Sequence, residues 1–170
     1  CVAFAEEYDL LSPDELAYNG GIYNCRFSPR NPWGAGTIAF VLTNNQVAMC
    51  CDWSAFDVGG SLYGSGCSII GGRGEVNRIG VQMGIYPDGS PSTITNFLLS
   101  GFTLESNHTG IYIRGGYGVI AGLTVQGFNG AAPGGLNPQY GIRCNNESSQ
   151  RVVFESLKVG GTWDIAALSV

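Results

Sequence analysis

Positive charge is scarce in this sequence. One lysine, Lys158, and seven arginines stand against 13 acidic residues, which gives a formal net charge of −5. Binding to nucleic-acid phosphates needs clustered cations, so nucleic acid is excluded as a partner. Charged residues of both signs form only 12% of the chain, while hydrophobic residues form 44%. This balance excludes intrinsic disorder and predicts a folded chain with a sizeable core.

The chain also lacks long apolar runs and metal-binding patterns. No run approaches the roughly 20 apolar residues that span a bilayer, so no membrane insertion is expected. His108 is the only histidine, and the six cysteines, at positions 1, 25, 50, 51, 67 and 144, form no CxxC pair. We therefore expect neither a metal site nor another cofactor. We interpret the cysteines as mostly reduced, buried thiols, with disulfides as the alternative in a secreted chain.

Helix-length patterns are missing as well, with one exception near the start. Ser12 suits an N-cap, Pro13 suits a first helical turn, and Glu15 is placed to close a capping box. These residues predict a short helix near 13–18, within an N-terminal cap and first strand that together span 1–33. Such a helix would cover the open edge of the first coil of strands.

Glycine, in contrast, is abundant. The 170 residues include 27 glycines and only 7 prolines. Glycine weakens the interior of a strand but suits tight bends, and the length fits one domain. We therefore expect a single domain made of many short strands joined by tight turns.

An apolar pattern recurs along the chain with the periodicity of strands. Residues 94–102 read Ile-x-x-Phe-x-Leu-x-Gly-Phe and are matched position for position by 120–128, while 154–161 match all but the last aromatic and 48–56 form a weaker copy. The alternation within each copy predicts strands rather than helices. Stacking of the copies predicts two internal columns of side chains, one of Ile94, Ile120 and Phe154 and one of Phe97, Leu123 and Leu157.

A second short strand follows each copy. Residues 110–113 read Gly-Ile-Tyr-Ile, and similar segments lie at 141–144, 164–168 and 36–40. A repeat of about 25 residues with two or three small strands cannot bury its apolar side alone, and stacking of successive coils solves this. We therefore predict an all-β fold, a right-handed parallel β-helix with rungs over 34–170 and a loop inserted at 129–139. An antiparallel sandwich or barrel is the alternative, but it gives no reason for recurring strands.

These repeated strands resemble those of the pectin-lyase-like right-handed parallel β-helices. The glycine-rich, acidic and lysine-poor texture is most similar to segments of bacteriophage tailspikes and polysaccharide depolymerases. The resemblance covers roughly residues 34–170 and implies an extracellular or virion-surface location. Members of the superfamily include lyases, glycoside hydrolases, noncatalytic glycan binders and structural spikes, so the fold does not select an activity. No member's catalytic motif carries over residue by residue.

Candidate catalytic carboxylates are scattered along the chain. Glycoside hydrolysis needs two of them across a groove, about 5 Å apart for retention or about 6.5 to 9.5 Å apart for inversion. Asp52 lies next to Trp53, Asp57 follows a few residues later, and Glu155 lies in the last copy of the repeat. If Trp53 points inward, Asp52 points outward. The competing interpretation is that these acids are solvated neighbours of core residues.

A lyase would need a base together with cations or Ca²⁺. Arg73 and Arg78 bracket Glu75, but no acidic cluster of the calcium-binding type is present. The sequence therefore favours hydrolase over lyase among the enzymatic readings.

Candidate glycan-binding residues are four tyrosines. Tyr86, Tyr112, Tyr117 and Tyr140 fall in predicted turns or at outward strand positions. Flat aromatic rings beside polar side chains suit sugar faces and hydroxyls. Covering a neighbouring subunit is the alternative role.

Two N-glycosylation sequons are also present. They begin at Asn107 and Asn146, and in the repeat frame both fall in turns that follow a strand. We interpret them as ordinary turn asparagines, because such tripeptides arise often by chance.

Three hypotheses for function remain open. The first is a structural, glycan-contacting module at an extracellular or virion surface, assembled as a homotrimer and without catalysis in this segment. The second is a polysaccharide-degrading enzyme, a hydrolase more than a lyase. The third is a filament or coat subunit that joins head to tail through uncovered strand edges.

Overall fold

The computed structural model describes residues 2–3, 20–86, 88–128, 130, 133–135, 137–145 and 150–169. Apart from one short 3₁₀ turn, η2 (Pro133–Gly135), the regular structure of these residues consists of β-strands. The prediction of an all-β chain is therefore confirmed. The predicted helix near 13–18 lies outside the described residues.

The strands follow one another at short intervals. They are β1 (Val2–Ala3), β2 (Gly20–Tyr23), β3 (Arg26–Phe27), β4 (Ile38–Leu42), β5 (Gln46–Ser54), β6 (Val58–Leu62), β7 (Ser68–Glu75), β8 (Ile79–Met83), β9 (Ile94–Ser100), β10 (Thr103–Glu105), β11 (Thr109–Ile113), β12 (Gly116–Ala121), β13 (Thr124–Gly127), β14 (Tyr140–Cys144), β15 (Gln150–Glu155), β16 (Lys158–Gly161) and β17 (Ala166–Ser169).

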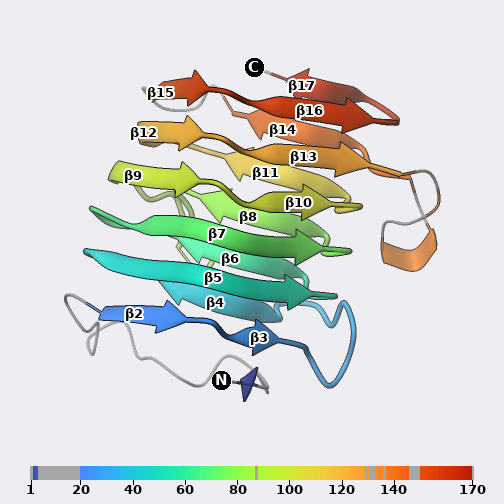
Figure 1. Cartoon of the computed structure of the whole chain (residues 1–170), viewed down its shortest axis with the longest axis horizontal. Coiled ribbons are helices and arrows are strands. Elements are labelled where there is room, and N and C mark those ends of the chain that lie inside the picture. The colour runs from blue at the N-terminus through green and yellow to red at the C-terminus, as the bar shows by residue number, and fades with distance from the viewer. Residues whose placement is uncertain are drawn as a thin grey trace.

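These strands form two sheets, and every pairing between them is parallel. The smaller sheet has the order β17-β14-β11-β8-β6-β4, and the larger follows β1-β3-β5-β7-β10-β13-β16, with β2, β9, β12 and β15 paired beside this path. The chain thus returns repeatedly to each sheet. In Figure 1 the strands of each sheet lie one above the other from the N-terminal to the C-terminal end.

A line of bends divides the larger sheet into two faces. At the bend, one residue in each coil has a positive φ between 50° and 65°: Asn24, Cys50, Gly71, Gly101, Gly122 and Ser156. We call the part before the bend the first face; it contains β2, residues 46–49 of β5, 68–70 of β7, β9, β12 and β15. We call the part after the bend the second face; it contains β3, 51–54 of β5, 72–75 of β7, β10, β13 and β16. The smaller sheet is the third face.

A column of glycines lines the start of the third face. A β-carbon at Gly59, Gly80 or Gly110 would collide with the carbonyl oxygen of the corresponding glycine in the next coil, which for Gly110 is Gly141. Glycine is therefore required near the start of β6, β8 and β11, the strands that contain these three residues. This explains the glycine of the recurring Gly-Ile-x-Ile segments.

The core fills the space between the three faces. Trp53 is 1% exposed and packs edge-on against Phe40, with ring centroids 5.1 Å apart. Its indole N–H donates to the carbonyl oxygen of Gly80 at 3.2 Å. Because its ring fills the space over Gly59 and Gly74, a β-carbon at either glycine would collide with it.

The predicted internal columns are correct for the later copies of the repeat and wrong for the copy at 94–102. Ile120 does lie beside Phe154, although Phe154 is exposed rather than internal. The partner of Ile120 in the preceding coil is Leu99, and Ile94 lies beside Gly116 instead. The reason is that the Ile-x-x-Phe-x-Leu spacing of 94–99 is repeated by Leu-x-x-Phe-x-Leu at 99–104. The second, overlapping pattern carries the bend glycine, Gly101, and is the one that stacks.

Candidate functional site

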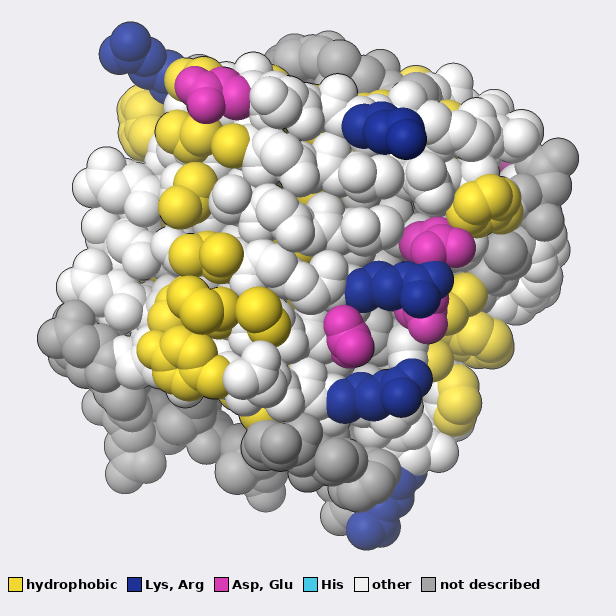
Figure 2. Space-filling view, in the orientation of Figure 1, with side chains coloured by type: hydrophobic (Ala, Val, Ile, Leu, Met, Phe, Trp, Pro, Cys, Tyr) yellow, Lys and Arg dark blue, Asp and Glu magenta, His cyan; other side chains and the backbone are white. Residues whose placement is uncertain are grey.

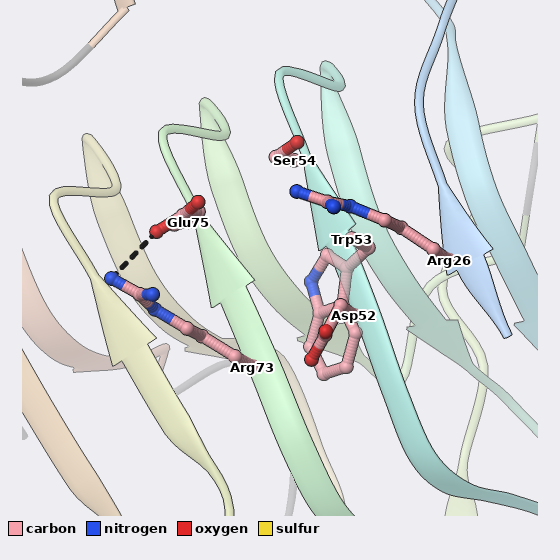
Figure 3. A pocket seen from close by; sticks show the side chains of 6 residues that line it. All are labelled: Arg26, Asp52, Trp53, Ser54, Arg73 and Glu75. Atoms are coloured by element: carbon pink, nitrogen blue, oxygen red, sulfur yellow. Dashed lines mark ion pairs between the residues drawn. The ribbon is translucent and has the colours of Figure 1, made fainter. Parts of the chain in front are cut away.

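A charged hollow lies on the second face. It is lined by Arg26, Asp52, Trp53, Ser54, Arg73 and Glu75, which come from β3, β5 and β7 (Figure 3). Side chains alternate between inside and outside along a strand, so the burial of Trp53 turns Asp52 outward, as expected from the sequence. Arg26, Asp52 and Arg73 are register partners in successive coils and form an outward column.

Arg73 is held by two carboxylates. Its Nη2 lies 2.8 Å from Glu75 Oε2 and donates to Glu105 Oε2 at 2.5 Å. The hydrogen bond to Glu105 is the main cause that raises the pKa of the guanidinium, and the charges of Glu75, Glu105 and Asp52 act in the same direction. The sequence had placed Glu75 between Arg73 and Arg78 but gave no signal for Glu105, because only the stacking of β7 on β10 brings that residue near.

The three carboxylates predicted as catalytic candidates lie apart. Asp52 lines the hollow, but Asp57 lies in the turn before β6, where its Oδ1 is 3.0 Å from Arg78 Nε and its Oδ2 accepts from the Gly36 N–H at 2.8 Å. Glu155 is exposed at the end of β15 on the first face. The structure therefore places Asp52 in the same hollow as Glu75, and apart from Asp57 and Glu155.

Two of the four candidate tyrosines, Tyr112 and Tyr140, contact the same arginine on the third face. The guanidinium carbon of Arg143 lies 4.9 Å from the ring centroid of Tyr140 and 5.7 Å from that of Tyr112. Tyr112 Oη accepts a hydrogen bond from Asn145 Nδ2 at 3.3 Å. We call Tyr112, Tyr140, Arg143 and Asn145 the tyrosine–arginine cluster; Arg143 and Asn145 were not singled out from the sequence.

The other two tyrosines lie elsewhere. Tyr117 is 41% exposed on β12, in the first face. Tyr86 is 43% exposed in the segment between β8 and β9, where its ring packs on Tyr63 with centroids 5.1 Å apart. Tyr86 and Tyr117 are therefore not part of the tyrosine–arginine cluster.

Asn107, the first residue of one sequon, is part of a buried hydrogen-bond ladder. Its Oδ1 accepts from both the backbone N–H and the Nδ2 of Asn77, each at 2.9 Å, and its own Nδ2 donates to the Gly74 carbonyl at 3.1 Å. Asn77 Oδ1 in turn accepts from the Phe56 N–H at 3.0 Å. Asn107 is 1% exposed, which agrees with a turn asparagine and leaves no room for a glycan. The other sequon asparagine, Asn146, lies outside the described residues.

The burial of the described cysteines matches the prediction in part. Cys25, Cys51 and Cys67 are buried in the core, whereas Cys50 is exposed at the bend. Desolvation raises the pKa of Cys67 to about 12, so its thiol is neutral at physiological pH. In the part of the chain that the structure describes, no three or more His, Cys, Asp or Glu side chains gather in a metal-binding arrangement.

The inserted loop predicted at 129–139 is described only in part. The Gly130 N–H donates to Asn137 Oδ1 at 2.8 Å, and Asn137 Nδ2 donates to Asp164 Oδ1 at 3.0 Å. Asn137 thereby ties the base of this segment to the turn before β17. Within the described ranges, no helix is long and apolar enough to cross a membrane.

Comparison of the chain with protein-family models, with curated proteins and with solved structures found no match.

Proposed function

We propose that this chain is a segment of right-handed parallel β-helix that serves as a structural, glycan-contacting module at an extracellular or virion surface, assembled as a homotrimer. The β-helix reading is supported by the parallel pairing of corresponding strands in successive coils and by the internal ladders of glycine and asparagine. Right-handedness follows from the strong preference of parallel crossover connections for that hand.

The tyrosine–arginine cluster carries the glycan-contacting part of the proposal. It combines two aromatic rings, a guanidinium and a side-chain amide on the outward side of β11 and β14. Ring edges and faces suit the apolar patches of a pyranose, and the guanidinium and amide are donors for its hydroxyl or carboxylate oxygens. A flat strand surface with few enclosing walls fits one side of a polymer better than a small, enclosed ligand.

The test is a glycan-array screen of the purified chain, followed by titration calorimetry with the best oligosaccharide. Tyr140→Ala and Arg143→Gln are expected to weaken binding at least tenfold. Tyr117→Ala, which alters an exposed tyrosine of the first face, is the matched control and is expected to change affinity less than twofold. No binding to any glycan, or equal losses with Tyr117→Ala and Tyr140→Ala, would contradict the proposal.

A polysaccharide hydrolase is the second candidate, because Asp52 and Glu75 line the same hollow. They lie on adjacent strands and two residues apart in register, which places their α-carbons about 8 Å apart from strand spacing alone. The separation of about 6.5 to 9.5 Å in inverting enzymes is measured between the two carboxyl groups, so this candidate requires the two side chains to hold their carboxylates at that spacing. Release of reducing sugar that is abolished by both Asp52→Asn and Glu75→Gln would favour this candidate over a noncatalytic module.

A further inference from the structure

The outward side of the first face is mostly apolar from β2 to β12, whereas on β15 the charged residues Arg151 and Glu155 lie beside Tyr117 and Ala121. Two columns of register partners form it, one of Val47, Ser68, Leu98, Val119 and Val153 and one of Tyr23, Met49, Ile70, Ser100 and Ala121. None of these side chains is fully buried, and Tyr23 and Val153 are 53% and 45% exposed. We call these ten residues the apolar stripe. Figure 2 shows hydrophobic side chains gathered in such a column on one side of the molecule.

Charge is segregated away from this stripe. The segments of the first face from β2 to β12, residues 20–23, 46–49, 68–70, 94–100 and 116–121, contain no charged residue. The second face, one bend away, carries Arg26, Asp52, Arg73, Glu75 and Glu105. Figure 2 shows the two columns side by side, hydrophobic on one side and charged on the other.

An apolar outer side is unusual for a parallel sheet in water, because such sheets are normally covered on both sides. Large exposed apolar patches mark interaction surfaces. The core covers the inner side of the first face, so its outer side is the one that lacks a cover among the described residues.

We infer that the apolar stripe is the surface through which copies of this chain pack against one another. This inference rests on the self-association in the proposed function and names the face that performs it. Two observations favour a second copy as the occupant, namely the distribution of charge and the size of the face.

The distribution of charge permits contact between copies on this face. With a net charge of −5, identical chains repel one another. The second face carries three cations, Arg26, Arg73 and Lys158, and three acids, Asp52, Glu75 and Glu105, so contact there would have to match charges of both signs across the interface. Contact through the stripe brings no like charges together from β2 to β12.

The size of the face fits the same occupant. Six stacked segments of about five residues on average give a surface about 24 Å along the stack and about 16 Å across, or about 400 Å² in flat projection. The accessible area exceeds this projection because side chains stand out from it, and a standard interface buries about 800 Å² on each partner. A second copy also offers the same repeat from coil to coil, so side chains can interdigitate along the entire stripe.

Light scattering of matched variants tests the inference. Leu98 and Val119 are register partners on the stripe, and Thr103 and Thr124 are register partners at outward, half-exposed positions of the second face. The unaltered chain is expected to show a discrete mass that is a multiple of 17.9 kDa at micromolar concentration. The double variant Leu98→Lys/Val119→Lys is expected to fall to 17.9 kDa, and Thr103→Lys/Thr124→Lys is expected to keep the mass of the unaltered chain.

Mixing of variants separates a lost interface from a lost fold. Leu98→Lys chains mixed with Leu98→Glu chains are expected to recover the assembled mass, since opposite charges then meet across the same face. A monomeric unaltered chain, or a Leu98→Lys/Val119→Lys variant that stays assembled, would overturn the inference. If the unaltered chain is monomeric, the stripe is instead a contact surface for a membrane or another protein. Glycan binding measured on the same samples reports on the tyrosine–arginine cluster, so failure of that site is distinguishable from failure of the stripe.

Discussion

At the residue scale, glycine has two different tasks in this molecule. At the bend, Gly101 supplies a positive φ of 65°, and no atom lies within 4 Å of where its β-carbon would be. On the third face, Gly110 supplies room, because a β-carbon there would collide with the Gly141 carbonyl oxygen and Val125. The same substitution should therefore have different costs at the two positions.

Gly110→Ala is expected to lower the free energy of unfolding by about 3 kcal/mol, because the coils above and below must move apart. Gly101→Ala is the matched control and is expected to lower the free energy of unfolding by about 1 kcal/mol. The left-handed backbone strains the alanine, and the smaller conformational entropy of the unfolded variant offsets part of that strain. Urea unfolding followed by circular dichroism measures both. Equal losses would show that the glycine column does not pack as described.

Cys67 is expected to make stability depend on alkaline pH. Its folded pKa of about 12 lies above the ordinary value of 9.0, so between these values the unfolded chain releases a proton that the folded chain keeps. The stabilisation is fully present below pH 9 and is lost as the pH rises towards 12, at about 1.4 kcal/mol per pH unit.

Cys67→Ser removes this titration and keeps a donor for the Thr43 carbonyl oxygen, which the thiol contacts at 2.8 Å. Between pH 8 and pH 10.5 the unaltered chain is expected to lose about 2 kcal/mol more than the variant. If the unfolding free energies of the unaltered chain and of Cys67→Ser change in parallel with pH, the Cys67 thiol is not desolvated.

At the element scale, the turn between the second and third faces depends on its asparagine ladder. Asn107→Ala would remove the acceptor of two Asn77 donors and one donor to the Gly74 carbonyl. Buried unpaired polar groups are costly, so this variant is expected to be destabilised by about 3 kcal/mol. Thr103→Ala, on the neighbouring strand, is the control and is expected to change stability by less than about 0.5 kcal/mol. Thermal unfolding measures the stability of both variants. If Asn107→Ala loses no more stability than Thr103→Ala, the ladder does not stabilise the turn.

The elements themselves were largely predictable from the sequence. Alternation of apolar residues marked the strands at 94–99, 120–125 and 154–159, and Gly-Ile-x-Ile marked β11 and β14 correctly as neighbours. The register of the copy at 94–102 was not predictable, because two overlapping runs have the same spacing and periodicity alone cannot choose between them. Stacking chose the run that puts Gly101 at the bend.

At the scale of the whole molecule, the candidate sites could be predicted only in part. The sequence singled out Asp52, Tyr112 and Tyr140, since outward acids and aromatics are visible in an alternating strand. It could not reveal Glu105 beside Arg73 or Arg143 beside Tyr112, because those contacts join different coils. The apolar stripe was invisible for the same reason, as its members are separated by whole coils in the chain.

All of these surfaces depend on one claim, that successive coils stack in the observed register. Disulfide formation tests this most directly, in a Cys1→Ser/Cys50→Ser background. Thr103 and Thr124 are register partners on β10 and β13, so their α-carbons lie about 4.8 Å apart, within disulfide range. Leu98 would be the partner of Thr124 in the register read from the sequence, but in the structure Leu98 pairs with Val119, which is five residues and one bend away from Thr124.

The measurement is the yield of intramolecular disulfide after mild oxidation of dilute protein, mapped by mass spectrometry. Thr103→Cys/Thr124→Cys is expected to close nearly completely, and Leu98→Cys/Thr124→Cys is expected to stay reduced. The reverse outcome, closure of the second pair and not of the first, would contradict the stacked register and with it the placement of every face described above.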